Sequence, residues 1–327
     1  MLATRAPLRI TLGGGGTDIP SYYTVFGGFF LSATIDKYVY LVAHERFDPG
    51  IRVSYSKTEI VERIDRLEHP IVREALGLLG PFDHLELLSI ADLPARTGLG
   101  SSGAFTVALL NVLHVLKREH VPPNVLAEEA CRIAIDLLHE PSGKQDEYSA
   151  AYGGVNSYAV SMDGTVNVSP VRISKSTIAE FENEILLFYT GITREARMVL
   201  ESQNKATLGG TKGTVEGLHR LKQIGVDSKN ALEDGELAEF GRLLGEHWDT
   251  KKRMAPNTST EKFDAIYDLA LKNGATGGKI MGAGGGGFFM FHCPSNKTKL
   301  TKVLESHGLI RMHYRLTYEG SKTVIDI

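Results

Sequence analysis

Residues 98–105, GLGSSGAF, have the composition of a phosphate-binding loop. A glycine turn followed by small hydroxyl residues and an apolar run lets backbone N–H groups at a helix N-terminus hold phosphate oxygens. A serine hydroxyl at such a position can also coordinate Mg²⁺. The alternative interpretation is that the glycines only permit a tight connection between a strand and a helix.

The sequence around this loop excludes two common nucleotide-binding folds. The spacing of its three glycines matches G-x-G-x-x-G, but a dinucleotide-binding fold also needs an acidic residue about 20 positions on, at the end of a second strand. Here that distance leads to Glu119, between two predicted helices. A Walker A loop needs G-K-[ST], and residues 98–105 contain no lysine. We therefore expect a lysine-free triphosphate loop at a helix start.

Composition describes an ordinary globular chain with unusual glycine clusters. The net charge of −3 gives no basic surplus for nucleic acid. Two cysteines exclude a disulfide framework, and we expect no signal peptide, no membrane span and a cytoplasmic location. The 35 glycines gather at residues 13–16, 98–103 and 282–287, flanked by apolar sequence rather than by linker residues.

The elements that must position these clusters alternate irregularly between strand and helix. Strand-like sequence dominates residues 1–46, and helical spacing follows over 58–79, with Pro70 as a break or a new start. Helices are predicted over most of 194–273, and strands again in the tail, including LIRMHYRLT at 309–317. This irregular order of strands and helices predicts an α+β fold with a domain boundary near residue 180.

Three ordered motifs carry a family resemblance: RAPLRITLGGGGTDIP (5–20), DLPARTGLGSSGAFTVALL (92–110) and KIMGAGGGGFFMF (279–291). Together they resemble the GHMP superfamily of small-molecule kinases. The resemblance implies a two-domain α+β fold, with ATP and the acceptor alcohol in the cleft between domains. We expect an N-terminal GHMP kinase domain over 1–180 and a C-terminal one over 181–327.

The resemblance also implies roles for residues of the first two motifs and of PSGKQDEYSAAYGG. Asp146 stands at the position of the catalytic base, and Arg9 at that of a cation that stabilises the aspartate and the charge that develops on transfer. ATP would be bound by Gly98, Leu99, Gly100, Ser101, Ser102 and Gly103. Without the family, Asp146 is an exposed helix-start aspartate and Arg9 a strand residue.

Substrate contacts are expected from the loops that follow the other two glycine clusters. Gly16, Thr17 and Asp18 match positions that contact sugar hydroxyls, and Gly284 and Gly285 would approach substrate across the cleft. An anionic sugar phosphate would also need cations. The candidates are Lys144, Arg194, Arg197 and Arg253.

The metal site departs from the family pattern. The family places a magnesium-binding glutamate about a dozen residues before the aspartate, and this chain has Ala134 there. Ser102 is then the best candidate for a side-chain ligand, with ATP and Mg²⁺ as the expected cofactors.

Within the superfamily, the motifs look most like bacterial D-glycero-D-manno-heptose 7-phosphate kinases. This likeness implies a phosphotransferase that phosphorylates the anomeric hydroxyl of the sugar phosphate. The product would be the 1,7-bisphosphate, which is used for surface polysaccharide synthesis. The alternatives are an L-fucokinase-like sugar 1-kinase and, because of Ala134, a catalytically weak sugar-nucleotide sensor. The expected partner is a small sugar phosphate, with no nucleic acid or membrane, and a homo-oligomer is left open.

Overall fold

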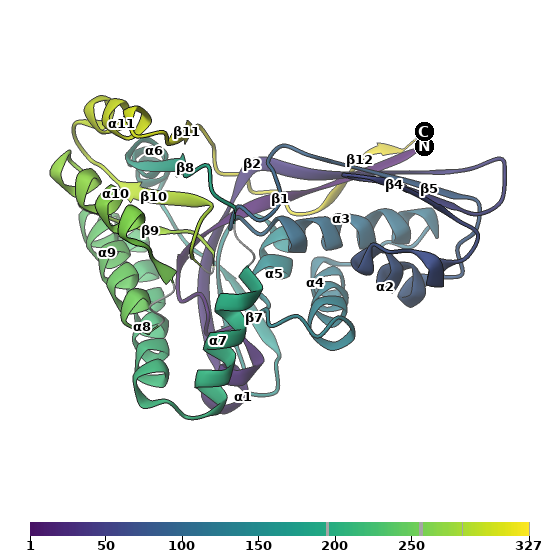
Figure 1. The fold of residues 1–327 in the computed structure, drawn as a ribbon, viewed down its shortest axis with the longest axis horizontal. Coiled ribbons are helices and arrows are strands. Elements are labelled where there is room, and N and C mark those ends of the chain that lie inside the picture. The colour runs from purple at the N-terminus through teal and green to yellow at the C-terminus, as the bar shows by residue number, and fades with distance from the viewer. Residues whose placement is uncertain (194–195, 255–257, 283, 327) are drawn as a thin grey trace.

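The computed structural model describes residues 1–193, 196–254, 258–282 and 284–326, and of residues 196–199 it describes the backbone alone. In this part of the chain, strands form two sheets with helices packed against each (Figure 1). The N- and C-terminal ends lie together at one end of the larger sheet. No helix among the described residues is long and apolar enough to cross a membrane.

The larger sheet has the strand order β12-β1-β2-β5-β3-β4, with β6 and β7 continuing from β2. Among the strands of the described residues, only β3 and β5 pair in parallel. The bounds are β1 (Leu2–Gly13), β2 (Gly28–Glu45), β3 (Ile51–Ser54), β4 (Thr58–Val61), β5 (Leu85–Ala91), β6 (Val155–Val160), β7 (Val166–Pro170) and β12 (Lys322–Asp326). The smaller, antiparallel sheet has the order β11-β8-β10-β9. It contains β8 (Ile185–Tyr189), β9 (Gly277–Ile280), β10 (Phe288–His292) and β11 (Ile310–Met312).

Helices cover one face of the larger sheet in the first half of the chain. The central one, α3 (Ser101–Leu116), is apolar on nearly every side and packs on β1 and β2. It contacts α2 (Pro70–Leu79), α4 (Pro123–Cys131) and α5 (Gln145–Tyr152), whereas α1 (Pro20–Phe26) lies beside the later helix α7 (Ala196–Leu208). A π-helical turn, Arg132–Leu137, continues α4. No strand interrupts residues 117–144, which agrees with the exclusion of a dinucleotide-binding fold.

Helices of the second half pack against both sheets. Helix α8 lies on β1 and β2, and α9 reaches both β9 and β1. A core of Trp248, Phe263, Phe289 and Phe291 joins α9, α10 and the smaller sheet. The bounds are α6 (Lys175–Glu184), α7 (Ala196–Leu208), α8 (Lys212–Asp234), α9 (Leu237–Met254), α10 (Glu261–Lys272) and α11 (Lys297–Ser306).

Two element predictions were wrong in part. Residues 58–61 form β4, paired with β3, and helix begins only after a 3₁₀ turn, with α2 at Pro70. The helical spacing there is accidental, because Ile60 is exposed whereas Glu59 is buried and accepts hydrogen bonds from Tyr55 and from the backbone N–H groups of residues 68 and 69. The strand predicted over residues 309–317 is also shorter, since β11 ends at Met312.

The α+β class is confirmed. The boundary near residue 180 stays a prediction. The chain passes from the larger to the smaller sheet between β7 and β8. Strand β12, near the end of the chain, nevertheless pairs with β1 in the larger sheet.

Candidate active site

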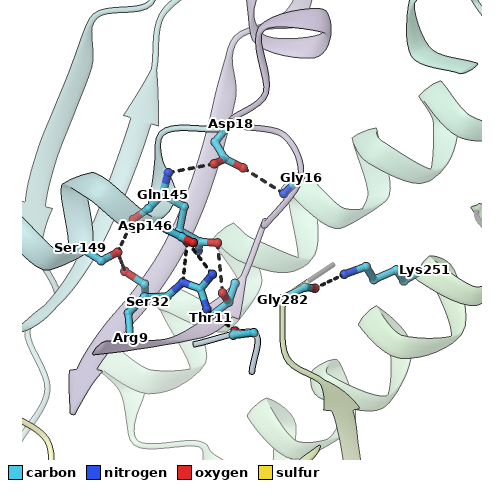
Figure 2. Close-up of polar contacts among 11 residues, drawn as sticks. Arg9, Thr11, Gly16, Asp18, Ser32, Gln145, Asp146, Ser149, Lys251 and Gly282 are labelled. Atoms are coloured by element: carbon cyan, nitrogen blue, oxygen red, sulfur yellow. Dashed lines mark hydrogen bonds and ion pairs between the residues drawn. The ribbon is translucent and has the colours of Figure 1, made fainter. Parts of the chain in front are cut away.

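The two residues expected to act in catalysis are in direct contact (Figure 2). Arg9 lies on β1 and is 5% exposed, and Asp146 lies in the first turn of α5 with a partly exposed carboxylate. Nε of Arg9 donates to Oδ1 of Asp146 at 2.9 Å, and Nη2 donates to the same oxygen. Nη1 donates to the carbonyl oxygen of Gly98 at 2.7 Å. One guanidinium therefore holds both the carboxylate and the glycine loop.

The glycine loop connects β5 to the start of α3. Gly98 and Gly100 have φ angles of 79° and 78°, a left-handed conformation that side chains rarely adopt. Gly100 caps the helix, and its carbonyl accepts from the N–H of Ala104 at 3.0 Å. Ser101 and Ser102 occupy the first turn, where backbone N–H groups have no partner within the helix. This geometry can bind phosphate oxygens at the helix start.

Asp18 follows the first glycine cluster and is 4% exposed. Its Oδ1 accepts from the N–H of Gly16 at 3.0 Å and its Oδ2 from the N–H of Gln145 at 2.9 Å. Burial raises the pKa of Asp18, with a smaller contribution in the same direction from Asp146, while the backbone donors act against the shift. The two carboxylates therefore lie near each other, because the loop that carries Asp18 is hydrogen-bonded to the start of α5 at Gln145.

A cavity of about 650 Å³ collects most of the predicted residues. Residues of both halves of the chain line it. The predicted ones among them are Arg9, Gly16, Asp18, Gly98, Gly100, Ser101, Ser102, Asp146 and Gly284. The predicted residues that do not line it are Thr17, Leu99, Gly103, Lys144, Arg253 and Gly285. The cavity thus joins the expected phosphate loop, the expected base and the expected sugar contacts.

Thr17 and the other buried predicted residues support the wall from behind. The hydroxyl of Thr17 contacts the carbonyl oxygen of Phe29 at 2.7 Å and accepts from the N–H of Phe29 at 3.0 Å, so it holds the loop. Leu99 is fully buried, and its carbonyl accepts from the N–H of Arg9 at 3.0 Å. The N–H of Gly285 donates to the carbonyl of Thr258 at 2.9 Å.

Two of the cations expected for a sugar phosphate, Lys144 and Arg253, do not line the cavity. The ammonium of Lys144 is 3.0 Å from both carboxylate oxygens of Glu128. Arg253 is exposed and contacts the hydroxyl of Thr250. Arg194 lies outside the described residues, as does the side chain of Arg197.

The position expected for a magnesium-binding glutamate also lies away from the cavity. Ala134 belongs to the π-helical turn, where its carbonyl accepts from the N–H of Glu140. A different glutamate faces the cavity. Glu147 is 5% exposed, and its Oε2 has no hydrogen-bond partner among the described residues. Burial, and secondarily the negative Asp146, raises the pKa of Glu147 to about 8.

Sequence reasoning missed this glutamate and two further parts of the wall. Basic residues His247, Lys251 and Lys279 line the cavity from α9 and β9. In the sequence, only Lys279 could have been noticed, because it is a lysine within an apolar strand just before the third glycine cluster. On the side of β5 and α2 the cavity is mostly apolar, and the rings of His69 and Phe105 stack there at 5.1 Å. Its residues include Val39, Tyr55, His69, Ile71, Leu93 and Phe105.

Comparison with known proteins gives the same family in sequence and in structure. Residues 54–154 match the GHMP kinases N terminal domain, and residues 228–307 match the GHMP kinases C terminal domain. A D-glycero-alpha-D-manno-heptose 7-phosphate kinase of Campylobacter jejuni is 31% identical over 98% of each chain. An L-fucokinase/L-fucose-1-P guanylyltransferase of Bacteroides fragilis is 26% identical over 93% of this chain and 36% of its own length.

A solved structure extends the match to the whole fold. A D-glycero-D-manno-heptose 1-phosphate kinase from Bacteroides thetaiotaomicron superposes with a TM-score of 0.82 at 25% identity, covering 100% of both chains. The chain belongs to the GHMP kinases and is a sugar kinase of that family, an ATP-dependent enzyme that transfers phosphate to a hydroxyl group.

Proposed function

We propose that this kinase phosphorylates the anomeric hydroxyl of D-glycero-D-manno-heptose 7-phosphate to give the 1,7-bisphosphate. The observation that carries the proposal is the Arg9–Asp146 pair, which faces the same cavity as the glycine loop and Asp18. The Campylobacter relative, named as a heptose 7-phosphate kinase, matches over nearly its whole length and supports this sugar. The product would serve the synthesis of nucleotide-activated heptose.

Asp146 acts as the general base in this proposal. Its carboxylate accepts the proton of the anomeric hydroxyl as the hydroxyl oxygen forms a bond to the γ-phosphorus of ATP, and the bond from that phosphorus to the β,γ-bridging oxygen breaks to release ADP. Arg9 keeps the carboxylate in place and stabilises the negative charge of the transferred group. Asp18 and Gln145 lie where sugar hydroxyls would be bound.

The nucleotide lies between the glycine loop and the apolar wall. The N–H groups at residues 101–103 would hold the phosphates. The stacked His69 and Phe105 rings, with Tyr55 packed edge-on against His69 at 4.7 Å, form a wall that suits a flat, apolar adenine ring. The loop at residues 98–100 would join the phosphate-binding region to the apolar region that binds adenine.

A magnesium ion fits the donor set of this cavity. Among the described residues no three His, Cys, Asp or Glu side chains form a metal cluster. Mg²⁺ bound to ATP needs only one or two protein ligands, however, because phosphates and water supply the rest. Ser102 and the unpartnered Oε2 of Glu147 would hold it. When bound, the ion would neutralise charge on the phosphates.

An ADP-release assay with a panel of acceptors tests the proposal. The panel contains heptose 7-phosphate, heptose 1-phosphate, unphosphorylated heptose, L-fucose and D-galactose, each with and without Mg²⁺. We expect the highest kcat/KM for heptose 7-phosphate. A higher value for L-fucose or heptose 1-phosphate would contradict the proposed substrate. Absence of turnover with every sugar would favour a sensor.

A further inference from the structure

Three basic side chains line the part of the cavity wall that the second half of the chain contributes. His247 and Lys279 are each 2% exposed, and Lys251 is partly exposed. His247 and Lys251 lie four residues apart on α9, so they share one face of that helix. Lys279 lies on β9, which packs against α9. The three groups therefore converge from two elements.

These groups have no acidic partner among the described residues. The Lys251 ammonium donates to a neutral acceptor, the carbonyl oxygen of Gly282. Neither ring nitrogen of His247 has a hydrogen-bond partner in the described part of the chain. The ammonium of Lys279 likewise has no hydrogen-bond or ion-pair partner among the described residues, although its backbone belongs to the β9–β10 pair. Buried basic groups without a counterion are rare, because burying an uncompensated charge is costly.

Burial disfavours the charged forms of the three basic groups. Burial lowers the pKa of Lys251 to about 8, and the nearby Arg9 adds to the effect. Burial and the Lys251 charge also lower the pKa of Lys279, and burial lowers that of His247. A bound anion would favour the charged form of all three groups and remove their mutual repulsion.

We infer that His247, Lys251 and Lys279 bind the phosphate group that the sugar substrate already carries. This inference rests on the proposed function, because it assumes a phosphorylated sugar in the cavity. Ammonium groups and a protonated imidazole donate charge-assisted hydrogen bonds to phosphate oxygens. The cluster would thus distinguish sugar phosphates from free sugars.

The phosphates of the nucleotide offer the same chemistry, and position favours the sugar phosphate. The nucleotide already has a phosphate site at the start of α3. Lys251 is instead close enough to the expected sugar ligand Asp18 for that carboxylate to raise the lysine's pKa, against the lowering by burial. In Figure 2, Gly282 lies between Lys251 and the Arg9–Asp146 pair, so Lys251 flanks the reacting centre.

Titration calorimetry of the full chain tests this assignment. Wild type, Lys279→Met and Lys251→Met are each titrated with heptose 7-phosphate, unphosphorylated heptose, mannose 6-phosphate, mannose and a non-hydrolysable ATP analogue. Lys252→Met is the matched control, because Lys252 is the neighbour of Lys251 but pairs with Asp264 at 3.1 Å and does not line the cavity. Thermal unfolding establishes that each variant is folded.

We expect wild type to bind a sugar phosphate at least about 10-fold more tightly than the matching free sugar, as a charge-assisted contact provides. Each cavity variant should lose that preference and keep its affinity for the ATP analogue within about 2-fold, while Lys252→Met behaves as wild type. Both cavity variants should also unfold at higher temperature than wild type without ligand, because a buried ionisable group is removed.

The assignment is overturned if wild type shows no preference for sugar phosphates, or if the preference survives in both cavity variants. It is also overturned if the variants lose affinity for the ATP analogue instead, which would make the cluster part of the nucleotide site. A preference for mannose 6-phosphate that depends on Lys279, in an enzyme that does not turn over heptose 7-phosphate, would uphold the cluster and reject the proposed sugar.

Discussion

At the residue scale, the proposed phosphate transfer depends on two adjacent carboxylates, Asp146 and Glu147, that differ in their surroundings. Asp146 is held by a guanidinium and is open to the cavity, whereas the adjacent Glu147 is buried with one oxygen unpartnered among the described residues. Neighbouring carboxylates in unlike environments can take different roles, because burial favours the neutral form and a cationic partner the ionised form. Two predictions separate these roles.

Asp146→Asn should lower kcat by about 10²- to 10⁴-fold, because the amide cannot accept the proton of the sugar hydroxyl. The variant keeps the size of the side chain, so the dissociation constant of the ATP analogue should stay near the wild-type value. Steady-state kinetics and calorimetry measure the two effects. Asp163→Asn, in the β6–β7 turn, is the control with unchanged kcat. A near-normal rate for Asp146→Asn would exclude it as the base.

Glu147→Gln should stabilise the ligand-free protein at pH 8 and do so less at pH 5. The native state keeps the proton of Glu147 up to a pKa of about 8, while the unfolded chain releases it near 4.5. Between these values the native state binds more protons, so the Glu147 contribution to the free energy of unfolding falls as pH rises. We expect a gain on the order of 1–3 kcal/mol at pH 8.

Urea unfolding at the two pH values measures this difference. Glu305→Gln, at an exposed position of α11, is the matched control and should change stability equally little at both. If Glu147→Gln has the same effect at pH 5 and pH 8, the side chain is not protonated in the native state.

At the element scale, the start of α3 must approach α5 closely for the site to form. A Cβ built on Gly103 would lie 2.7 Å from the Cβ of Asp146, closer than side chains pack. The absence of a side chain at Gly103 therefore sets the distance between the glycine loop and Asp146, the proposed base. Gly103 acts through this packing, since it does not line the cavity itself.

Gly103→Ala should destabilise the protein by about 1–3 kcal/mol and lower kcat, because α5 must shift away from α3. Gly77→Ala in α2 is the matched control, because nothing lies within 4 Å of its added Cβ. The control should be neutral or stabilising by up to about 1 kcal/mol. Chemical unfolding and kinetics distinguish them, and equal effects of both substitutions would contradict the close-packing argument.

The sequence predicted the parts of the site that lie in contiguous motifs. Gly98, Gly100 and Asp146 could be identified because their motifs have a fixed order and spacing. Residues 58–61 were misassigned because Ile60, Ile64 and Leu67 follow helical spacing, and only the pairing of residues 58–61 with β3 shows that they form a strand. Local spacing cannot supply such a tertiary contact.

The basic cluster was beyond sequence reasoning for a related reason. His247 and Lys279 are 32 residues apart and on different elements, and each alone looks like a surface residue. Their burial depends on how α9 packs on β9, which no local pattern specifies. Lys144 is the opposite case. It lies in a sequence motif that was expected to line the site, but its ammonium pairs with Glu128 and does not line the cavity.

At the scale of the whole molecule, the cavity exists only because distant segments meet. Strand β1 contributes Arg9, α5 contributes Asp146, and α9 and β9 contribute the basic cluster from more than 100 residues further on. Strand β12 pairs with β1, so the end of the chain supports the strand that carries Arg9 (Figure 1). Both halves of the chain therefore build the cavity that would hold ATP and the sugar.

The central claim, transfer of phosphate to the anomeric oxygen of a sugar phosphate, is tested most directly by the structure of the product. The enzyme is incubated with ATP, Mg²⁺ and D-glycero-D-manno-heptose 7-phosphate, and the product is analysed by ¹H and ³¹P NMR. If phosphate is transferred to the anomeric oxygen, we expect one new phosphorus signal coupled to the anomeric proton. The 7-phosphate signal should be retained, and one ADP should form per product molecule. A new phosphate on any other hydroxyl, or no product while heptose 1-phosphate or L-fucose is phosphorylated, would contradict it.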